Sequence, residues 1–226
     1  MKLVIFDCDG TIVDSQNGIH AAMLHAYGAL GLTPPRRCDT VAVIGLSLPE
    51  AFLRLSPDAA APVRRQLAES YKQAFFQMRH DPAHEDRLFD GAADVIGALA
   101  RRDDVRLGIA TGKSIRGVER LLDREGWHGH FATVQTADTH PSKPHPSMIA
   151  TAMADVGAVA SRTVMIGDTT FDIEMARLAG VGAIGVTWGY HSAALLREAG
   201  AHLLVDGYAE LPAAIERLVA ELEAVE

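Results

Sequence analysis

Residues Met1 to Thr11 read M-K-L-V-I-F-D-C-D-G-T. The continuous apolar run from Leu3 to Phe6 is typical of a strand that is buried on both faces of a parallel sheet. Asp7 and Asp9 follow where this run ends, and side chains two residues apart in a strand point the same way. The sequence therefore predicts two carboxylates beyond the carboxyl end of a strand, where open α/β sheets bind their ligands.

Two carboxylates that lie this close together need a cation or a shared proton between them. A hard ion with a preference for oxygen ligands, such as Mg2+, would meet that need. The alternative is that Asp7, Asp9 and Gly10 simply begin a turn, since Asp and Gly are common in turns. A third carboxylate and a cationic side chain at other strand ends would favour the metal site.

The composition limits the possible functions. A chain of 226 residues with 48% hydrophobic residues can build a real core. Its net charge of -8 disfavours an extended nucleic-acid surface and gives no attraction to anionic membranes, so we expect neither partner. There are two cysteines, Cys8 and Cys38, no recognisable signal peptide and no apolar run that could cross a bilayer. We expect a cytoplasmic protein with reduced thiols.

The segment from Ser15 to His84 shows no alternation of strands and helices. Helical spacing follows Ser15, which could cap a helix, and continues to Leu30. A second helical stretch runs from about Pro62 to Met78, and Val41 to Leu55 between them is less regular. These patterns predict a helical cap at residues 15–85, inserted into a core formed by residues 1–14 and 86–226.

The remainder of the chain alternates short apolar strands with helical stretches, which favours an α/β fold: a doubly wound parallel sheet with right-handed crossovers. The strand of Leu3 to Phe6 belongs to the same sheet. The further strands are expected at Val105–Ala110, Ala132–Gln135, Thr163–Ile166, Ala183–Thr187 and His202–Val205. The helices are expected at Ala92–Arg102, Ile115–Glu125, Pro146–Val156, Phe171–Ala179, Ala193–Glu198 and Leu211–Leu222.

Polar residues follow three of these later strands. The first is followed by Thr111-Gly112-Lys113-Ser114, and the third by G-D-T-T-F-D at residues 167–172. The loop beyond Gln135 contains S-K-P-H-P at residues 142–146. Gathered at one edge of the sheet, these segments would surround a cation with carboxylates and supply donors to a phosphate, which suits phosphoryl transfer. The carboxylates are Asp7, Asp9, Asp168 and Asp172, and the donors are Thr111, Gly112 and Lys143.

Four motifs in this order, D-C-D-G-T, T-G, K-P and G-D-T-T-F-D, resemble those of the haloacid dehalogenase superfamily. The inserted helical segment resembles the small α-helical cap of one subgroup. V-D-S at 13–15, L-F-D-G at 88–91 and V-T-W-G-Y-H at 186–191 are similar to phosphoglycolate phosphatases and their relatives. True dehalogenases of the superfamily do not carry the second aspartate, so dehalogenation is not expected.

The resemblance implies a role for each motif residue. Asp7 would be the nucleophile, and Asp9 would act as general acid and then as general base. Mg2+ would be held by the side chains of Asp7 and Asp168 and by the backbone carbonyl of Asp9. Asp172 would support the metal waters or Lys143. Phosphate binding would fall to Thr111, Gly112 and Lys143.

The expected activity is Mg2+-dependent hydrolysis of a small phosphorylated metabolite, phosphoglycolate or a similar ester, through an aspartyl-phosphate, with the cap excluding water. A phosphomutase of the same fold would share every core residue and is the nearest alternative. A phospho-accepting signalling domain is a second alternative from another class. Such domains are about half this length, have no cap and do not place the accepting aspartate on the first strand. Oligomeric state remains open.

Two glycine patterns are not interpreted as nucleotide sites. Gly180 to Gly185 matches G-x-G-x-x-G, but it follows a helix and enters a strand, the reverse of the order that dinucleotide binding requires. Gly108 to Ser114 lacks one residue of a P-loop, although its N–H groups could still hold one phosphate.

Overall fold

A parallel sheet forms the centre of the molecule. The computed structural model describes residues 1–78 and 86–224, and in them six strands pair in the order β5-β4-β1-β6-β7-β8. The first strand, β1, therefore lies inside the sheet with a parallel neighbour on each side. The strands are β1 (Lys2–Phe6), β4 (Val105–Thr111), β5 (Phe131–Thr136), β6 (Thr163–Gly167), β7 (Gly182–Val186) and β8 (Leu203–Val205).

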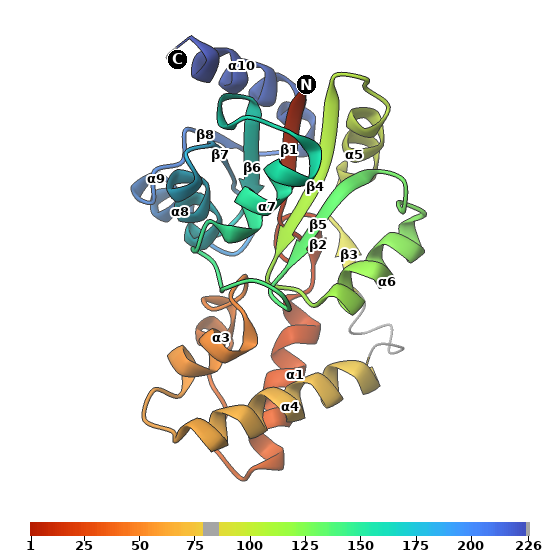
Figure 1. Ribbon diagram of the computed structural model, residues 1–226. Helices are drawn as coiled ribbons and strands as arrows, with labels where there is room; N and C mark the ends of the chain where they lie inside the picture. The colour runs from red at the N-terminus through yellow and green to blue at the C-terminus, as the bar shows by residue number, and fades with distance from the viewer. Residues whose placement is uncertain (79–85, 225–226) are drawn as a thin grey trace.

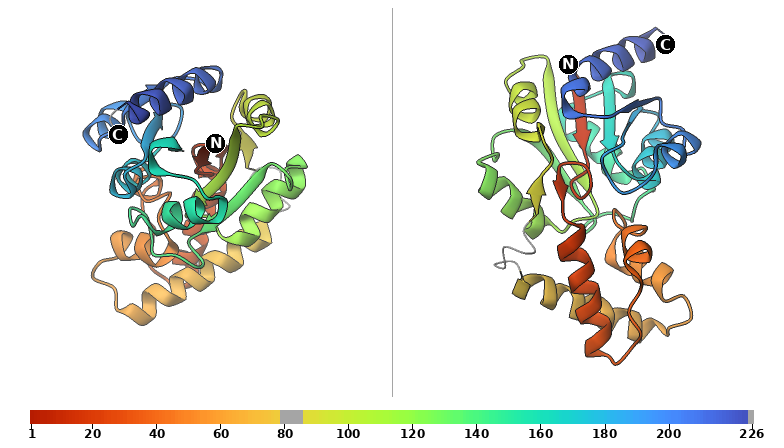
Figure 2. Two further views of the ribbon diagram at one scale, coloured as in Figure 1. Left: turned by 45° about the horizontal axis from the view of Figure 1, so that its top comes forward. Right: turned by 180° about the vertical axis from the view of Figure 1, so that it is seen from behind.

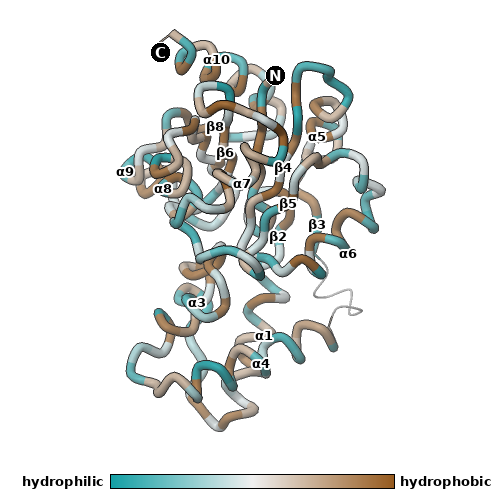
Figure 3. Tube along the Cα trace, viewed as in Figure 1, coloured by the Kyte–Doolittle hydropathy of each residue, from teal (hydrophilic) through white to brown (hydrophobic). Residues whose placement is uncertain are grey.

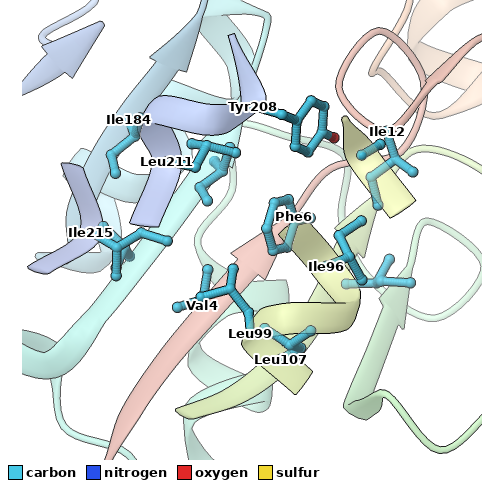
Figure 4. Close-up of a cluster of buried hydrophobic side chains, with 14 of the residues drawn as sticks. Val4, Phe6, Ile12, Ile96, Leu99, Leu107, Ile184, Tyr208, Leu211 and Ile215 are labelled. Atoms are coloured by element: carbon cyan, nitrogen blue, oxygen red, sulfur yellow. The ribbon is translucent and has the colours of Figure 1, made fainter. Parts of the chain in front are cut away.

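Helices cover both faces of this sheet, because successive side chains of β1 point to opposite faces and each face is apolar. Val4 and Phe6 pack into one buried cluster, with side chains of α5 (Ala92–Ala100), α6 (Ile115–Glu125) and α10 (Leu211–Glu223). Figure 4 shows part of this cluster. Leu3 and Ile5 pack into the second cluster, against α7 (Ser147–Val156), α8 (Thr170–Ala179) and α9 (Ala193–Glu198). The predicted doubly wound α/β fold is confirmed.

Four helices form a separate helical module beyond the carboxyl ends of the strands (Figures 1 and 2). They are α1 (Gln16–Ala29), α2 (Arg37–Val41), α3 (Leu48–Leu55) and α4 (Ala61–Met78). The module has its own buried cluster, which includes Met23, Phe52 and Tyr71. Its helices alternate between hydrophobic and hydrophilic segments in Figure 3, as amphipathic helices do.

A short antiparallel pair joins the module to the sheet. β2 (Val13–Asp14) leads into α1, and β3 (Arg87–Leu88) leads back to α5. This pair is absent from the sequence-based expectation because two residues are too few to show a period of two. The predicted irregularity of Val41–Leu55 is also wrong for its second half, since Leu48, Ala51, Phe52 and Leu55 have helical spacing and form one face of α3.

No helix within the described residues combines the length and the apolar character that crossing a bilayer requires.

Candidate active site

Three neighbouring strands deliver the motif residues to one edge of the sheet. Asp7 directly follows β1, Thr111 ends β4, and Asp168 directly follows β6. Because β4, β1 and β6 are adjacent and parallel, their carboxyl ends meet at the same edge. This is the edge beyond which the helical module lies (Figure 1).

Three carboxylates gather here. One oxygen each of Asp7, Asp168 and Asp172 lies within 4.8 Å of the others, and all three residues are fully buried. Asp168 accepts hydrogen bonds from the hydroxyl of Thr11 at 3.0 Å and from the backbone N–H of Tyr190 at 2.8 Å. We call this group the carboxylate cluster.

Gly10 shapes the cluster. It has φ +89°, and a Cβ built on it would lie 2.2 Å from Oδ2 of Asp168. Both the left-handed backbone and the missing side chain are therefore needed for the chain to pass this close to the carboxylate.

Lys143 supplies the positive charge of the site. Its fully buried ammonium group lies 2.8 Å from Oδ1 of Asp7 and 2.6 Å from Oδ1 of Asp172. Oδ2 of Asp172 accepts hydrogen bonds from the backbone N–H and the hydroxyl of Thr169, at the start of α8. Asp172 therefore holds Lys143 with one oxygen and the helix start with the other.

Asp7 is the least satisfied member of the cluster. Lys143 contacts it as an ion pair, but the geometry is not that of a hydrogen bond, and neither oxygen of Asp7 has a hydrogen-bond partner among the described residues. Burial raises the pKa of Asp7 from 3.8 to about 6, with Lys143 opposing that rise. Burial likewise raises the pKa of Asp168 well above its usual range, and the charge of Asp172 raises it further.

The cluster fits a divalent cation on its own chemistry. Three buried carboxylates face the single ammonium group of Lys143, so with all groups ionised two negative charges are left uncompensated. The two oxygens of Asp7 that have no hydrogen-bond partner are hard ligands of the kind that Mg2+ binds.

Asp9 belongs to a different set of contacts. Its Oδ1 accepts hydrogen bonds from Ser15 Oγ and from Lys113 Nζ, each at 2.7 Å. Ser15 precedes α1, as expected, but its hydroxyl does not cap the helix because it is bound to Asp9. The carboxylate of Asp9 therefore lies outside the carboxylate cluster, in contact with the connection to the helical module.

Lys113 links this aspartate to the return connection of the module. Its ammonium group also lies 2.8 Å from Oδ2 of Asp86, immediately before β3, and only 7% of its side chain is exposed. Burial alone would lower the pKa of Lys113, but the charges of Asp9 and Asp86 raise it above its ordinary value. Lys113 is thus held as a cation between two carboxylates.

Thr111 and Gly112 lie beside the helical module. Thr111 is buried, and its hydroxyl accepts a hydrogen bond from the backbone N–H of Lys113 at 3.2 Å. A Cβ built on Gly112 would lie 2.6 Å from the carbonyl oxygen of Gly45, which belongs to the module. The structure therefore brings the predicted phosphate-binding loop into direct contact with the inserted helices.

Two other contacts fasten the module to the site. The backbone N–H of Ser47 donates to the hydroxyl of Ser142 at 2.9 Å, next to Lys143. The guanidinium of Arg54 lies over the ring of Phe171 at 4.8 Å from its centroid. The module is closed over the sheet edge in this structure.

Sequence reasoning missed the contributions of Lys113 and Tyr190. Lys113 stood within a quoted strand-end motif, and its position directly after T-G was the available signal. Tyr190 binds Asp168 through its backbone and receives a hydrogen bond on its hydroxyl from the backbone of Ser15. Its motif, V-T-W-G-Y-H, had indicated only a similarity to phosphoglycolate phosphatases.

Comparisons with known proteins agree with this architecture. The family described as haloacid dehalogenase-like hydrolase matches residues 4–186. The chain belongs to this family.

Individual relatives are similar over nearly their whole length. The probable phosphatase IndB of Dickeya dadantii is 37% identical over 219 residues, covering 96% of this chain and 94% of that protein. A phosphoglycolate phosphatase of Agrobacterium fabrum is 30% identical over 226 residues, covering 97% and 94%. The crystal structure of a predicted phosphatase from Clostridium acetobutylicum has a TM-score of 0.84 at 22% identity, covering 96% of this chain and 98% of that one. The predicted family is confirmed, and the expected enzyme class, a phosphoric monoester hydrolase, agrees with these names.

Proposed function

We propose that the protein is a Mg2+-dependent phosphatase that hydrolyses a small phosphorylated metabolite through an aspartyl-phosphate on Asp7. The observation that carries this proposal is the state of Asp7, which is buried among carboxylates, faces Lys143 and has two oxygens without a hydrogen-bond partner. Such a carboxylate is available both to a cation and to an electrophile.

The metal would be held by the side chains of Asp7 and Asp168 and by the backbone carbonyl of Asp9. Asp172 engages Lys143 and the start of α8, so we assign it to supporting Lys143 rather than to direct metal binding. The bound cation would neutralise phosphate oxygens and draw charge from the transferring phosphoryl group.

The chain's own residues would carry out two successive displacements at phosphorus. An oxygen of Asp7 forms a bond to phosphorus while the bond from phosphorus to the leaving oxygen breaks, and Asp9 gives its proton to that oxygen. Asp9 then takes a proton from water as the water oxygen bonds to phosphorus. Inorganic phosphate leaves and the carboxylate of Asp7 is restored. Lys143, Thr111 and the N–H of Gly112 hold the phosphoryl oxygens in both steps.

We assign residues 15–85 to a cap and residues 1–14 and 86–226 to the core. The contacts of Gly45 with Gly112 and of Ser47 with Ser142 support this assignment, because they join the inserted segment to the phosphate-binding loops. A closed cap would keep bulk water from the site during transfer to Asp7.

The test is hydrolysis of p-nitrophenyl phosphate and phosphoglycolate by purified protein, with Mg2+ and with EDTA. We expect turnover with Mg2+ and little without it. In water enriched in 18O, the released phosphate should contain one solvent oxygen per turnover. Transfer of the phosphoryl group to a second sugar instead of water would identify a phosphomutase, and absence of turnover on both esters with Mg2+ would contradict the proposal.

A further inference from the structure

A cavity of about 780 Å³ lies between the helical module and the edge of the sheet. Asp9 and Lys113 line it, together with residues of α1, α3 and α4. On the proposed function, Asp9 protonates the leaving oxygen of the substrate, so the leaving group must occupy space next to Asp9. This leaving-group cavity supplies that space.

The wall contributed by the module is largely apolar. The side chains that form it are aliphatic or aromatic and belong to residues Ile19, Met23, Ile44, Leu46, Tyr71 and Phe75. Tyr71 and Phe75 stack with their ring centroids 5.8 Å apart. Cavities of 300–1,000 Å³ hold ligands far larger than the two-carbon acid of phosphoglycolate.

The cations of the cavity are already engaged or exposed. Lys113, the buried one, lies between Asp9 and Asp86. Lys72 is paired with Glu69 at 2.8 Å. The other two that line the cavity, Arg116 and Arg120, are exposed. Among the described lining residues, no buried cation is therefore left to receive a carboxylate on the leaving group.

Two of the N–H groups at the start of α6 are already engaged. A helix start can bind an anion through its free N–H groups. Here the N–H of Ile115 donates to Asp138 at 2.8 Å, and the N–H of Gly117 donates to the hydroxyl of Ser114. Asp138, which also lines the cavity, would repel a second negative charge.

We propose that the substrate is a phosphomonoester whose leaving group is uncharged and has an apolar or aromatic body larger than glycolate. A charge on the leaving group is disfavoured because the buried cation of the cavity is already engaged. An apolar body is favoured by the wall that α1, α4 and the loop before α3 form. Phosphoglycolate itself is then a weak substrate, although it shares the phosphate that the carboxylate cluster and Lys143 would recognise.

Three probes test this inference: phosphoglycolate, 2-hydroxyethyl phosphate and benzyl phosphate. All three release a primary alcohol, and the second replaces only the carboxylate of the first. We expect kcat/KM to rise along this series, with benzyl phosphate about 10-fold or more above phosphoglycolate, the effect of burying an aromatic group. A kcat/KM for phosphoglycolate equal to or above that for benzyl phosphate overturns the inference and leaves the proposed function intact. Turnover of none of the three contradicts the proposed function itself.

The variant Phe75→Ala tests whether the cavity causes the preference for an apolar leaving group. The ratio of kcat/KM for benzyl phosphate to that for phosphoglycolate should fall by about 3- to 10-fold, mainly through KM, because an aromatic contact is lost. Leu53→Ala is the matched control, since Leu53 is exposed on α3 and does not line the cavity. If Phe75→Ala does not fold, Phe75→Leu takes its place. A ratio that is unchanged in the folded variant overturns the assignment of the apolar wall.

Discussion

The carboxylate cluster and the leaving-group cavity are built differently. The cluster takes its members from the ends of β1 and β6 and the start of α8, and every member is fully buried. The cavity takes its apolar wall from two inserted helices, α1 and α4, and from the loop before α3. Parallel strands fix the first arrangement through backbone geometry, whereas the second depends only on which side chains the helices present.

We therefore expect the carboxylate cluster to determine the type of reaction and the cavity to determine the choice of substrate. Changes in the carboxylate cluster should abolish chemistry for every ester. Changes near the cavity should alter the relative rates of different esters. The expected effects below run from the largest to the smallest.

Asp7→Asn should abolish hydrolysis of all phosphomonoesters, because the amide is a poor nucleophile and a poor metal ligand. Since the substitution also removes a buried charge, the fold should remain intact, as far-UV circular dichroism can show. Asp206→Asn, an exposed carboxylate that binds Thr187, is the control and should retain activity. Robust turnover by Asp7→Asn would contradict the assignment of Asp7 as the nucleophile, and with it the distinction between the carboxylate cluster and the cavity.

Asp9→Asn should lower kcat by about 10²–10⁴, the usual worth of general acid–base catalysis. The loss should be greater for alkyl phosphates than for p-nitrophenyl phosphate, because nitrophenolate leaves without needing a proton. Steady-state kinetics on both esters measure this. Equal losses on the two esters would argue against Asp9 as the acid.

Lys113→Met should lower kcat on alkyl phosphates by about 10-fold, a part of the full contribution of the acid, because Asp9 loses a charged partner that positions it. The loss on p-nitrophenyl phosphate should be smaller. Lys2→Met is the matched control: Lys2 also lies between two carboxylates, Asp104 and Glu216, but at the beginning of β1. An equal loss in both lysine variants would indicate a general effect on stability.

Asp168→Asn should raise the Tm of the metal-free protein by about 2–4 °C for each kcal/mol of repulsion that it removes. The hydroxyl of Thr11 can reverse its hydrogen bond to accept from the new amide. In the wild type, Mg2+ should raise the Tm, and this increase should be lost in the variant. Thermal unfolding followed with EDTA and with Mg2+ measures both effects. An Mg2+ response that survives in Asp168→Asn would exclude that side chain as a ligand.

The pH dependence of stability gives the smallest effect. Because the pKa of Asp7 is raised by burial to about 6 in the folded state, the folded protein binds this proton more tightly than the unfolded chain. The stabilisation is complete below the unfolded pKa near 4 and is lost as pH rises through about 6. In EDTA, the Tm advantage of Asp7→Asn over wild type should therefore grow from pH 4 to pH 7. A constant difference would contradict the raised pKa.

The sequence allowed the sheet, its strand-end residues and the helical insertion to be predicted, because each leaves a local pattern. Asp7, Thr111 and Asp168 each stand where an apolar run ends, and parallel strands bring such ends together. The position of Lys113 between Asp9 and Asp86 could not be predicted, since it depends on how the return connection at β3 packs against the β4–α6 loop. The helix of Leu48–Leu55 did have a readable helical spacing, but the irregular residues before it obscured that spacing.

The close approach of Gly112 to the carbonyl of Gly45 carries a consequence for how such a protein can diverge. Because the side chain on the core loop is a hydrogen atom, the two backbones are in direct contact, and the inserted segment lies against the predicted phosphate-binding loop. A methyl group there would act as a wedge, tilting the whole insertion while leaving the acidic residues where they are. The residue at position 112 can thus determine how closely the helical module packs on the core, without changing the residues of the carboxylate cluster.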